Sequence, residues 1–442
     1  MLHLSLDRTR PRGLARQLAA GVREAIRAGR LESGTRLPPS RELAADLGVS
    51  RGVVVEAYAQ LTAEGFLIAR QGAGTRVAKV VPGEPTPTST VERSVMRLGT
   101  PDLTSFPRKA WLAATRHVLN TVPHRELGYP EPLGAPALRE ALAAHLNRVR
   151  AASVTPGSIT VVGGVAHGLS LVFRALGPLR LAIEDPTSPR QLPLLRGAGA
   201  TLLPVPVDEE GMDTGRLPDA EAALLTPAHQ YPTGVVLSPE RRALLQEWLT
   251  GDRLAVEDDY DAEFRYDRDP VGCLQGLRPD RTVHIGSVSK TLAPALRLGW
   301  VAAPPRLIAR LAELRSESDL GSPVLEQLTL ARLIETGEYD RHVRAMRLRY
   351  RARRDALVTA LAAWLPEARV RGVSAGQHLY VELPGRDEAD VLARAHAAGL
   401  PVDGGGDYRL VHEGPAALVL GFGGSTEDAI TATVRALAEA IA

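Results

Sequence analysis

The chain has 442 residues with 44% hydrophobic and 24% charged side chains, which excludes a disordered chain and predicts two or three globular domains. Its net charge of +2 is uneven, because residues 1–80 hold 13 Lys+Arg against 7 Asp+Glu (+6) and the remainder 40 against 44 (−4), so the basic N-terminal part suits a polyanion partner. The single cysteine, Cys273, excludes an intrachain disulfide and a site with two or four cysteine ligands, and we predict no metal. No stretch approaches the roughly 18 to 20 apolar residues of a membrane span, so we expect a soluble cytoplasmic protein.

Three short helices and a hairpin are predicted in the first 80 residues. Apolar side chains recur every fourth residue in the first helix, the second runs from a cap at Ser40 to Gly48, and the third follows a cap at Ser50. Residues 66–70 and 75–79 flank a glycine-rich turn and predict a hairpin. Helix, tight turn, helix and hairpin is the order of a winged helix-turn-helix, which binds double-stranded DNA.

Arginines occupy the positions of this unit that would face a duplex. Arg41 lies near the start of the second helix and Arg51 at the start of the third, and arginine there can fork onto phosphate or guanine. Gly52 offers no side chain, so neighbouring residues must supply the readout. The predicted DNA-binding residues are Arg41, Ser50, Arg51, Val53, Arg70, Gly72, Gly74 and Arg76.

Residues 30–44 (RLESGTRLPPSRELA), 47–51 (LGVSR) and 61–66 (LTAEGF) resemble the winged helix of the GntR superfamily. The resemblance covers nearly all of residues 11–79. It implies that Arg41, Arg51 and the wing tip at residues 72–74 touch DNA. Gly52 stands where that family usually has a polar residue.

A linker and a larger α/β domain follow. Residues 80–97 are rich in Pro, Ser and Thr, the composition of a semi-extended linker. Beyond them, short apolar runs alternate with helical segments, which indicates a parallel or mixed sheet covered on both faces. A long helix is predicted from about residue 339 to 364, followed by strands at 378–383 and 417–422 in a small α+β lobe. The predicted domains are 1–79, 80–97 and 98–442, with the small lobe at about 340–442.

Lys290 is one of only three lysines, with Lys79 and Lys109, and it follows an apolar strand and two serines. Open α/β sheets place ligands at such strand ends. Asp258 and Tyr260 close another apolar strand 32 residues upstream, where a carboxylate can hold a pyridine nitrogen protonated. Arg297 can fork onto a phosphate. Each feature alone is common on a solvated surface, but the combination indicates a site for pyridoxal 5'-phosphate (PLP).

These residues resemble fold-type I PLP enzymes, and specifically the aminotransferase-like part of the MocR subfamily of GntR regulators. The resemblance spans roughly residues 98–440 and includes segments 99–103, 129–139, 226–234 and 295–299. It implies that Lys290 forms the internal aldimine, that Asp258 pairs with the pyridine nitrogen and that Tyr260 bonds the ring hydroxyl. The other implied cofactor contacts are Ser287, Ser289, Arg297, the helix start at Gly164, Val165 and Ala166, His229, Tyr231 and Tyr129.

The resemblance also implies partners. Tyr129 resembles a tyrosine that a partner subunit contributes, which implies a domain-swapped, head-to-tail homodimer with composite sites. Arg190, and less directly Arg409, stand where an effector carboxylate would bind. Two departures, the absence of the usual serine and glutamine at residues 163–166 and Ser188 in place of a tyrosine, imply a weaker hold on the phosphate and weaker ring stacking.

We therefore predict a PLP-dependent, DNA-binding transcription regulator that senses PLP or an amino-group metabolite at Lys290. One alternative is an active aminotransferase with an appended DNA-binding domain. The other is a DNA-binding module whose aminotransferase fold serves only for dimerisation.

Overall fold

The computed structural model describes residues 6, 13–70, 74–79, 96, 98–268 and 270–442. The chain divides into two compact units, Met1–Val91 and Glu92–Ala442, and each is described by itself. Within the described residues, no helix combines the length and the apolar character that a membrane crossing requires.

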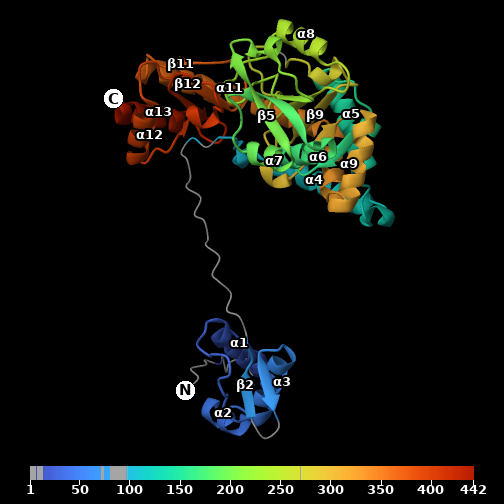
Figure 1. Ribbon diagram of the computed structural model, residues 1–442, viewed down its shortest axis with the longest axis vertical. Coiled ribbons are helices and arrows are strands. Elements are labelled where there is room, and N and C mark those ends of the chain that lie inside the picture. The colour runs from blue at the N-terminus through green and yellow to red at the C-terminus, as the bar shows by residue number, and fades with distance from the viewer. Residues whose placement is uncertain (1–5, 7–12, 71–73, 80–95, 97, 269) are drawn as a thin grey trace. The chain divides into compact units, whose positions relative to one another are not determined.

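The first unit is a three-helix bundle with a two-stranded hairpin (Figure 1). Helices α1 (Leu14–Arg27), α2 (Ser40–Leu47) and α3 (Arg51–Ala63) precede antiparallel strands β1 (Leu67–Arg70) and β2 (Gly74–Val77). The predicted elements are confirmed, except that Ser40 is the first residue of α2 and Pro39 takes the cap position. Gly48 ends α2 in the left-handed conformation, at φ 59°. One apolar cluster, which includes Leu18, Val54 and Leu61, holds the five elements together.

An eight-stranded sheet forms the centre of the second unit, in the order β3-β10-β9-β8-β7-β4-β5-β6. The five strands from β9 to β5 are parallel, whereas β10 is antiparallel to both of its neighbours and β6 is antiparallel to β5. The sheet is therefore mixed. Its strands are β3 (Ile159–Val162), β4 (Leu179–Asp185), β5 (Ala200–Asp208), β6 (Gly211–Met212), β7 (Ala222–Leu225), β8 (Leu254–Asp259), β9 (Thr282–Ser287) and β10 (Gly299–Ala302).

Helices cover both faces of this sheet, as its apolar runs require. Alternate strand residues pack on α6 (Val165–Leu176), α7 (Leu192–Gly197) and α9 (Pro305–Ser318) on one face. On the other face they pack on α8 (Pro239–Trp248), and on α4 (Arg108–Thr121), α5 (Pro136–Arg150) and α10 (Val324–Glu335). Figure 1 shows α8 across the sheet from α6 and α7.

The C-terminal lobe is a smaller α+β layer. Helix α11 (Glu338–Trp364) leads into an antiparallel sheet of order β11-β12-β14-β13, which packs on α11, α12 (Glu388–Ala397) and α13 (Glu427–Ile441). Its strands are β11 (Arg369–Val370), β12 (His378–Glu382), β13 (Asp403–Gly404) and β14 (Ala417–Gly421). Short 3-10 helices in the second unit are η1 (Leu103–Ser105), η2 (His124–Leu127), η3 (Pro156–Ser158), η4 (Thr214–Arg216), η5 (Leu274–Gly276), η6 (Pro294–Leu296) and η7 (Gly406–Tyr408).

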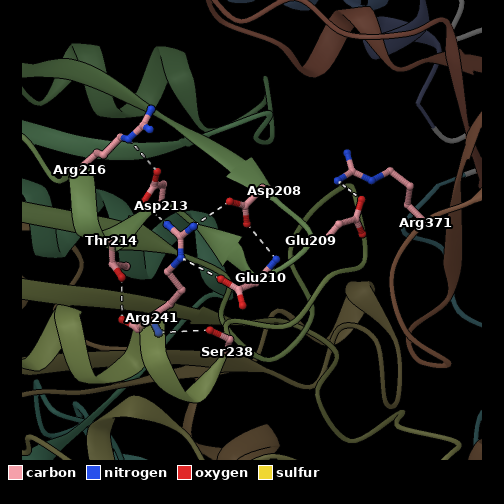
Figure 2. A network of polar contacts seen from close by, with 9 residues as sticks. All are labelled: Asp208, Glu209, Glu210, Asp213, Thr214, Arg216, Ser238, Arg241 and Arg371. Atoms are coloured by element: carbon pink, nitrogen blue, oxygen red, sulfur yellow. Dashed lines mark hydrogen bonds and ion pairs between the residues drawn. The ribbon is translucent and has the colours of Figure 1, made fainter.

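Polar contacts tie this small lobe to the large one. Figure 2 shows Arg241 of α8 among acidic side chains of the β5–β6 region, and Arg371 of the small lobe 2.8 Å from Glu209. A buried pair adds to this, because Arg353 of α11 donates to Asp102 at 2.8 Å. In Figure 2 it is Arg371 that joins the small lobe to the turn between β5 and β6.

Candidate functional site

The amine of Lys290 lies where strands β8 and β9 end. These strands are parallel neighbours, and Asp258 pairs with Ile285, so Asp258 and the segment after β9 meet at one sheet edge. Lys290 Nζ donates a hydrogen bond to the Gly99 carbonyl at 2.6 Å. Burial lowers the pKa of Lys290, an effect that Asp261 and Asp258 oppose. A lowered pKa leaves more of the amine neutral and nucleophilic.

Asp258 is a buried carboxyl with one oxygen unused. Its Oδ2 accepts a hydrogen bond from Gln191 Nε2 at 2.7 Å, whereas the buried Oδ1 has no partner among the described residues. Burial raises the pKa of Asp258 to about 7, although the Gln191 hydrogen bond lowers it. A buried acceptor without a partner is costly, so this oxygen is suited to a donor or cation that the chain itself does not supply.

Tyr260 and His229 form the side of the site that follows β7 and β8. Tyr260 Oη lies 2.8 Å from His229 Nδ1, which is also 3.0 Å from Asp261 Oδ2. Tyr231 lies edge-on to Tyr260, with ring centroids 5.7 Å apart. His378 of the small lobe is 5.2 Å from His229 between ring centroids. An aromatic wall of this kind can face a flat ring.

A candidate anion site lies at the start of α6. Gly164 takes the cap position at φ 94°, so the free N–H groups of the first turn begin at Val165 and Ala166. A Cβ at Gly164 would lie 3.2 Å from both terminal nitrogens of Arg297, whose Nη2 donates to the Gly163 carbonyl. Ser287 is buried, and its Oγ accepts a hydrogen bond from the Ser289 N–H at 3.4 Å. The predicted phosphate contacts are thus gathered around one helix end.

The structure places the remaining predicted ligand residues as follows. Arg190 is exposed and makes no hydrogen bond or ion pair with any described residue. Arg409 donates to the carbonyls of Gly414 and Pro415 and to Tyr380 Oη, at 3.0, 2.5 and 3.0 Å. Tyr129 is 91% exposed, and its role in a partner's site stays a prediction.

The predicted DNA-facing arginines are exposed on the first unit. Arg51 Nε donates to Ser40 Oγ at 3.4 Å, which joins the starts of α2 and α3. Arg41 and Arg70 have no polar partner among the described residues, and Arg76 donates to the Gly34 carbonyl at 2.9 Å. Ser50 takes the cap position of α3 without a side-chain hydrogen bond to the helix, and Val53 is half-buried in its first turn. Gly74 has φ 81°, and Gly72 lies outside the described residues.

Some neighbours of these sites were not predicted. Arg36 is exposed beside the hairpin, and a Cβ at Gly74 would lie 3.0 Å from its Nε. In the second unit, Gly99 and Gln191 hold Lys290 and Asp258. Asp261 could have been singled out, because it belongs to the same acidic run as Asp258, whereas Gln191 carries no sequence signal.

The residues present fit PLP. The unpaired Asp258 Oδ1 matches a protonated pyridine nitrogen, and the backbone at Gly164 leaves space beside Arg297 that a side chain would fill. Lys290 is half-buried, and its Nζ lies against the Gly99 backbone, where an added Cβ would come within 2.7 Å of it. When bound, PLP supplies an aldehyde that bonds amines and an electron-withdrawing ring.

Both units match known families. Residues 14–77 match the bacterial regulatory proteins of the gntR family, and residues 93–397 match aminotransferase class I and II. The HTH-type pyridoxine biosynthesis transcriptional regulator PdxR of Corynebacterium glutamicum is 34% identical, over 100% of this chain and 98% of that one. The HTH-type transcriptional regulator TauR of Rhodobacter capsulatus is 32% identical, over 92% and 94%. A kynurenine aminotransferase of Pyrococcus horikoshii superposes with a TM-score of 0.73 at 27% identity, over 78% of this chain and 90% of that one.

Proposed function

Because the chain belongs to the MocR-type GntR regulators, which join a DNA-binding helix-turn-helix to an aminotransferase-like domain, we propose that it switches transcription when an amino-group ligand or PLP occupies the site at Lys290. Lys290 would bond the cofactor's aldehyde with loss of water, Asp258 would accept a hydrogen bond from the pyridine nitrogen and Tyr260 would hydrogen-bond the ring hydroxyl. Ser287, Ser289, Arg297 and the first turn of α6 hold the phosphate, and His229 and Tyr231 line the ring.

One observation carries this proposal. Asp258 Oδ1 is buried and has no partner among the described residues, and it lies at the same sheet edge as the half-buried Lys290. A fold does not keep a buried charge without a partner cheaply, and a protonated pyridine nitrogen is the partner that aminotransferase-like folds bind at this edge. A neutral amine beside that carboxyl is the group that an aldehyde requires.

We further propose that the basic first unit holds a double-stranded operator. Its phosphate and base contacts would come from the exposed Arg41, Arg51, Arg70 and Arg76, with the N-terminal ends of α2 and α3 against the duplex. A head-to-tail homodimer, in which Tyr129 contributes to the partner's site, would pair two such units. Coupling requires the ligand to bind the two states of the dimer with different affinity.

The test is the visible absorbance of lysine-bound PLP in the full-length protein. Wild type mixed with PLP should show the band, and Lys290→Ala should abolish it. The matched control is Lys109→Ala, because Lys109 is exposed on α4 and should leave the band intact. Borohydride reduction followed by peptide mapping should place the label on the peptide containing Lys290. An unchanged band in Lys290→Ala, or a label on another lysine, would refute the assignment.

A working aminotransferase is the second candidate, because an amine whose pKa is lowered, as burial lowers that of Lys290, is also the group that transamination requires. Sustained turnover of an amino acid with a keto acid, at ordinary enzyme rates of about 1 per second or more, would favour this candidate. A single half-reaction would favour a sensor. Failure to bind PLP at micromolar concentration would instead leave the fold as a dimerisation scaffold.

A further inference from the structure

The small sheet presents one row of side chains toward the site. Leu418 and Leu420 of β14 pack on the helices of the small lobe, so Ala417 and Val419 lie on the opposite face, in a cluster with Tyr380 and Tyr408. Tyr231 of the large lobe packs against this cluster. The face of the small sheet that carries Val419 is therefore the face turned to the Lys290 site.

Asp403 belongs to that row. It pairs directly with Val419 across the antiparallel β13–β14 ladder, and directly opposed residues point to the same face of a sheet. The next residue agrees, because a Cβ at Gly404 would meet Glu388 of α12 at 2.7 Å, on the helix side. Asp403 is half-buried and makes no side-chain hydrogen bond or ion pair with any described residue.

A set of hydrogen bonds brings Arg190 close to this row. The Thr187 N–H donates to the Tyr408 carbonyl at 2.8 Å, and the Asp185 carboxylate accepts from the backbone N–H groups of Leu410, Val411 and His412 at 2.7, 3.0 and 2.9 Å. The turn after β4, which carries Arg190, is thereby fixed against the segment after β13.

Arg190 and Asp403 are thus two opposite charges beside one site, and neither side chain has a polar partner in the described part of the chain. Burial raises the pKa of Asp403 and the Arg190 guanidinium lowers it, so the two lie within electrostatic reach, yet no ion pair joins them. Arg190 also lowers the pKa of Lys290. Arg409, by contrast, already donates to two carbonyls and Tyr380. Among the described residues that the site brings together, Arg190 is a cation and Asp403 an anion with no hydrogen bond or ion pair.

We infer that Arg190 and Asp403 together select the ligand, which is a diamino monocarboxylic acid: one amine faces Lys290, the carboxylate pairs with Arg190 and the second ammonium pairs with Asp403. This inference rests on the proposed function for the position of the reacting amine. A monoamino acid would leave Asp403 unpaired and a diamine would leave Arg190 unpaired. Sites built to pair a polar group discriminate strongly against analogues that lack it.

The test compares L-ornithine with three compounds that each lack one of its groups. 5-Aminovalerate lacks the α-amine, L-norvaline the side-chain amine and putrescine the carboxylate. Affinities are measured by calorimetry and by the change in visible absorbance, on full-length protein with PLP, and by calorimetry alone without PLP. L-lysine with 6-aminohexanoate, L-norleucine and cadaverine forms a second series that is one methylene longer.

In at least one series we expect the diamino acid to bind about tenfold or more tightly than each analogue. Asp403→Asn should bring the diamino acid to within about threefold of the monoamino acid that keeps the Lys290-facing amine, and Arg190→Gln should remove the preference over the diamine. Asp407→Asn, a neighbouring exposed carboxylate, should keep the wild-type ranking.

The inference is overturned if neither series shows a preference for the diamino acid, or if Asp403→Asn retains the full preference over both monoamino acids. Failure of the proposed function has a different signature, which is no PLP on Lys290 in wild type. In that case the calorimetric ranking without PLP still decides on Asp403 and Arg190.

Discussion

Replacing Asp258 by Asn should separate two effects of this buried carboxyl: its cost to the stability of the cofactor-free protein and its contribution to PLP affinity. Burial raises its pKa from the ordinary 3.8 to about 7, against a smaller opposing effect of the Gln191 hydrogen bond. At about 1.4 kcal/mol for each tenfold change in proton affinity, ionising this carboxyl costs the folded protein up to about 4 kcal/mol. The cost is present only when PLP is absent, because a protonated pyridine nitrogen would pair with the free oxygen.

The sign follows from the proton balance. The unfolded chain loses this proton near pH 4, whereas the folded protein keeps it to about pH 7. The free energy of unfolding of cofactor-free wild type therefore falls as the pH rises through this window. Asparagine has no proton to lose, so the variant should be more stable than wild type by up to about 4 kcal/mol at pH 8, and nearly equal to it at pH 4.

Urea unfolding followed by tryptophan fluorescence measures this difference. All four tryptophans, at positions 111, 248, 300 and 364, lie in the second unit, so the signal reports on that unit alone. Asp219→Asn is the control, since its side chain is 73% exposed and should change stability little and without growth from pH 5 to 8. Equal urea midpoints for wild type and Asp258→Asn at pH 8 would refute the reasoning.

Adding PLP should reverse the advantage. Asparagine cannot offer a carboxylate to a protonated pyridine nitrogen, and a charge-assisted hydrogen bond is worth about 1.5 to 3 kcal/mol, so PLP affinity should fall about 10- to 100-fold. Saturating PLP then stabilises wild type more than the variant. A simple packing change at residue 258 would shift both forms in the same direction, which is the outcome that would exclude a role in cofactor binding.

Three further substitutions test other parts of the structure. Asp185→Asn should lower the free energy of unfolding by about 3 kcal/mol at pH 7, because the N–H donors of residues 410–412 outweigh burial and lower the pKa of Asp185. Urea titrations should show this deficit shrinking as the pH falls below about 4, which is the pKa of this carboxyl in the unfolded chain. Gly164→Ala should weaken PLP binding about tenfold in an absorbance titration, because of strain at φ 94° and crowding of Arg297. Gly177→Ala is the control: it lies at the other end of α6 with open space around it and should bind PLP normally. Arg51→Ala should weaken operator binding by about 1 to 3 kcal/mol in mobility-shift assays, and a contact to phosphate would also reduce the salt slope by about 1; equal affinity at every salt concentration would remove Arg51 from the interface.

The acidic run at the end of β8 shows how much of the site could be predicted. Strand alternation alone separates its members, because Asp258 and Asp259 must point to opposite faces of the sheet. Asp258 lies at the Lys290 site, whereas Asp259 lies on the other face, 2.8 Å from the buried Arg150. The sequence predicted the residue at the site, but the partner of Asp259 lies 109 positions away and follows from no local pattern.

Sheet topology set a similar limit. The short apolar runs beyond the linker predicted buried strands, and β10 is one of them. Burial on both faces does not reveal direction, so the antiparallel pairing of β10 could not be predicted. Asp403 is a comparable case within the ligand site. It lies in a two-residue strand among glycines, and only its pairing with Val419 determines which face its side chain takes.

The distribution of the site between the two lobes bears on how a ligand could act as a signal. The proposed cofactor contacts of this chain other than Tyr129 come from residues 164–297, in the large lobe, so PLP alone would distinguish little between arrangements of the lobes. Arg190 belongs to the large lobe and Asp403 to the small one. A ligand that pairs with both contacts the two lobes at once, and it binds more tightly whichever arrangement holds these charges at the right separation. A ligand shifts an equilibrium only by its difference in affinity for the two states. Ligand binding to Arg190 and Asp403, which lie on opposite lobes, can therefore favour one arrangement of the lobes more than the cofactor contacts can.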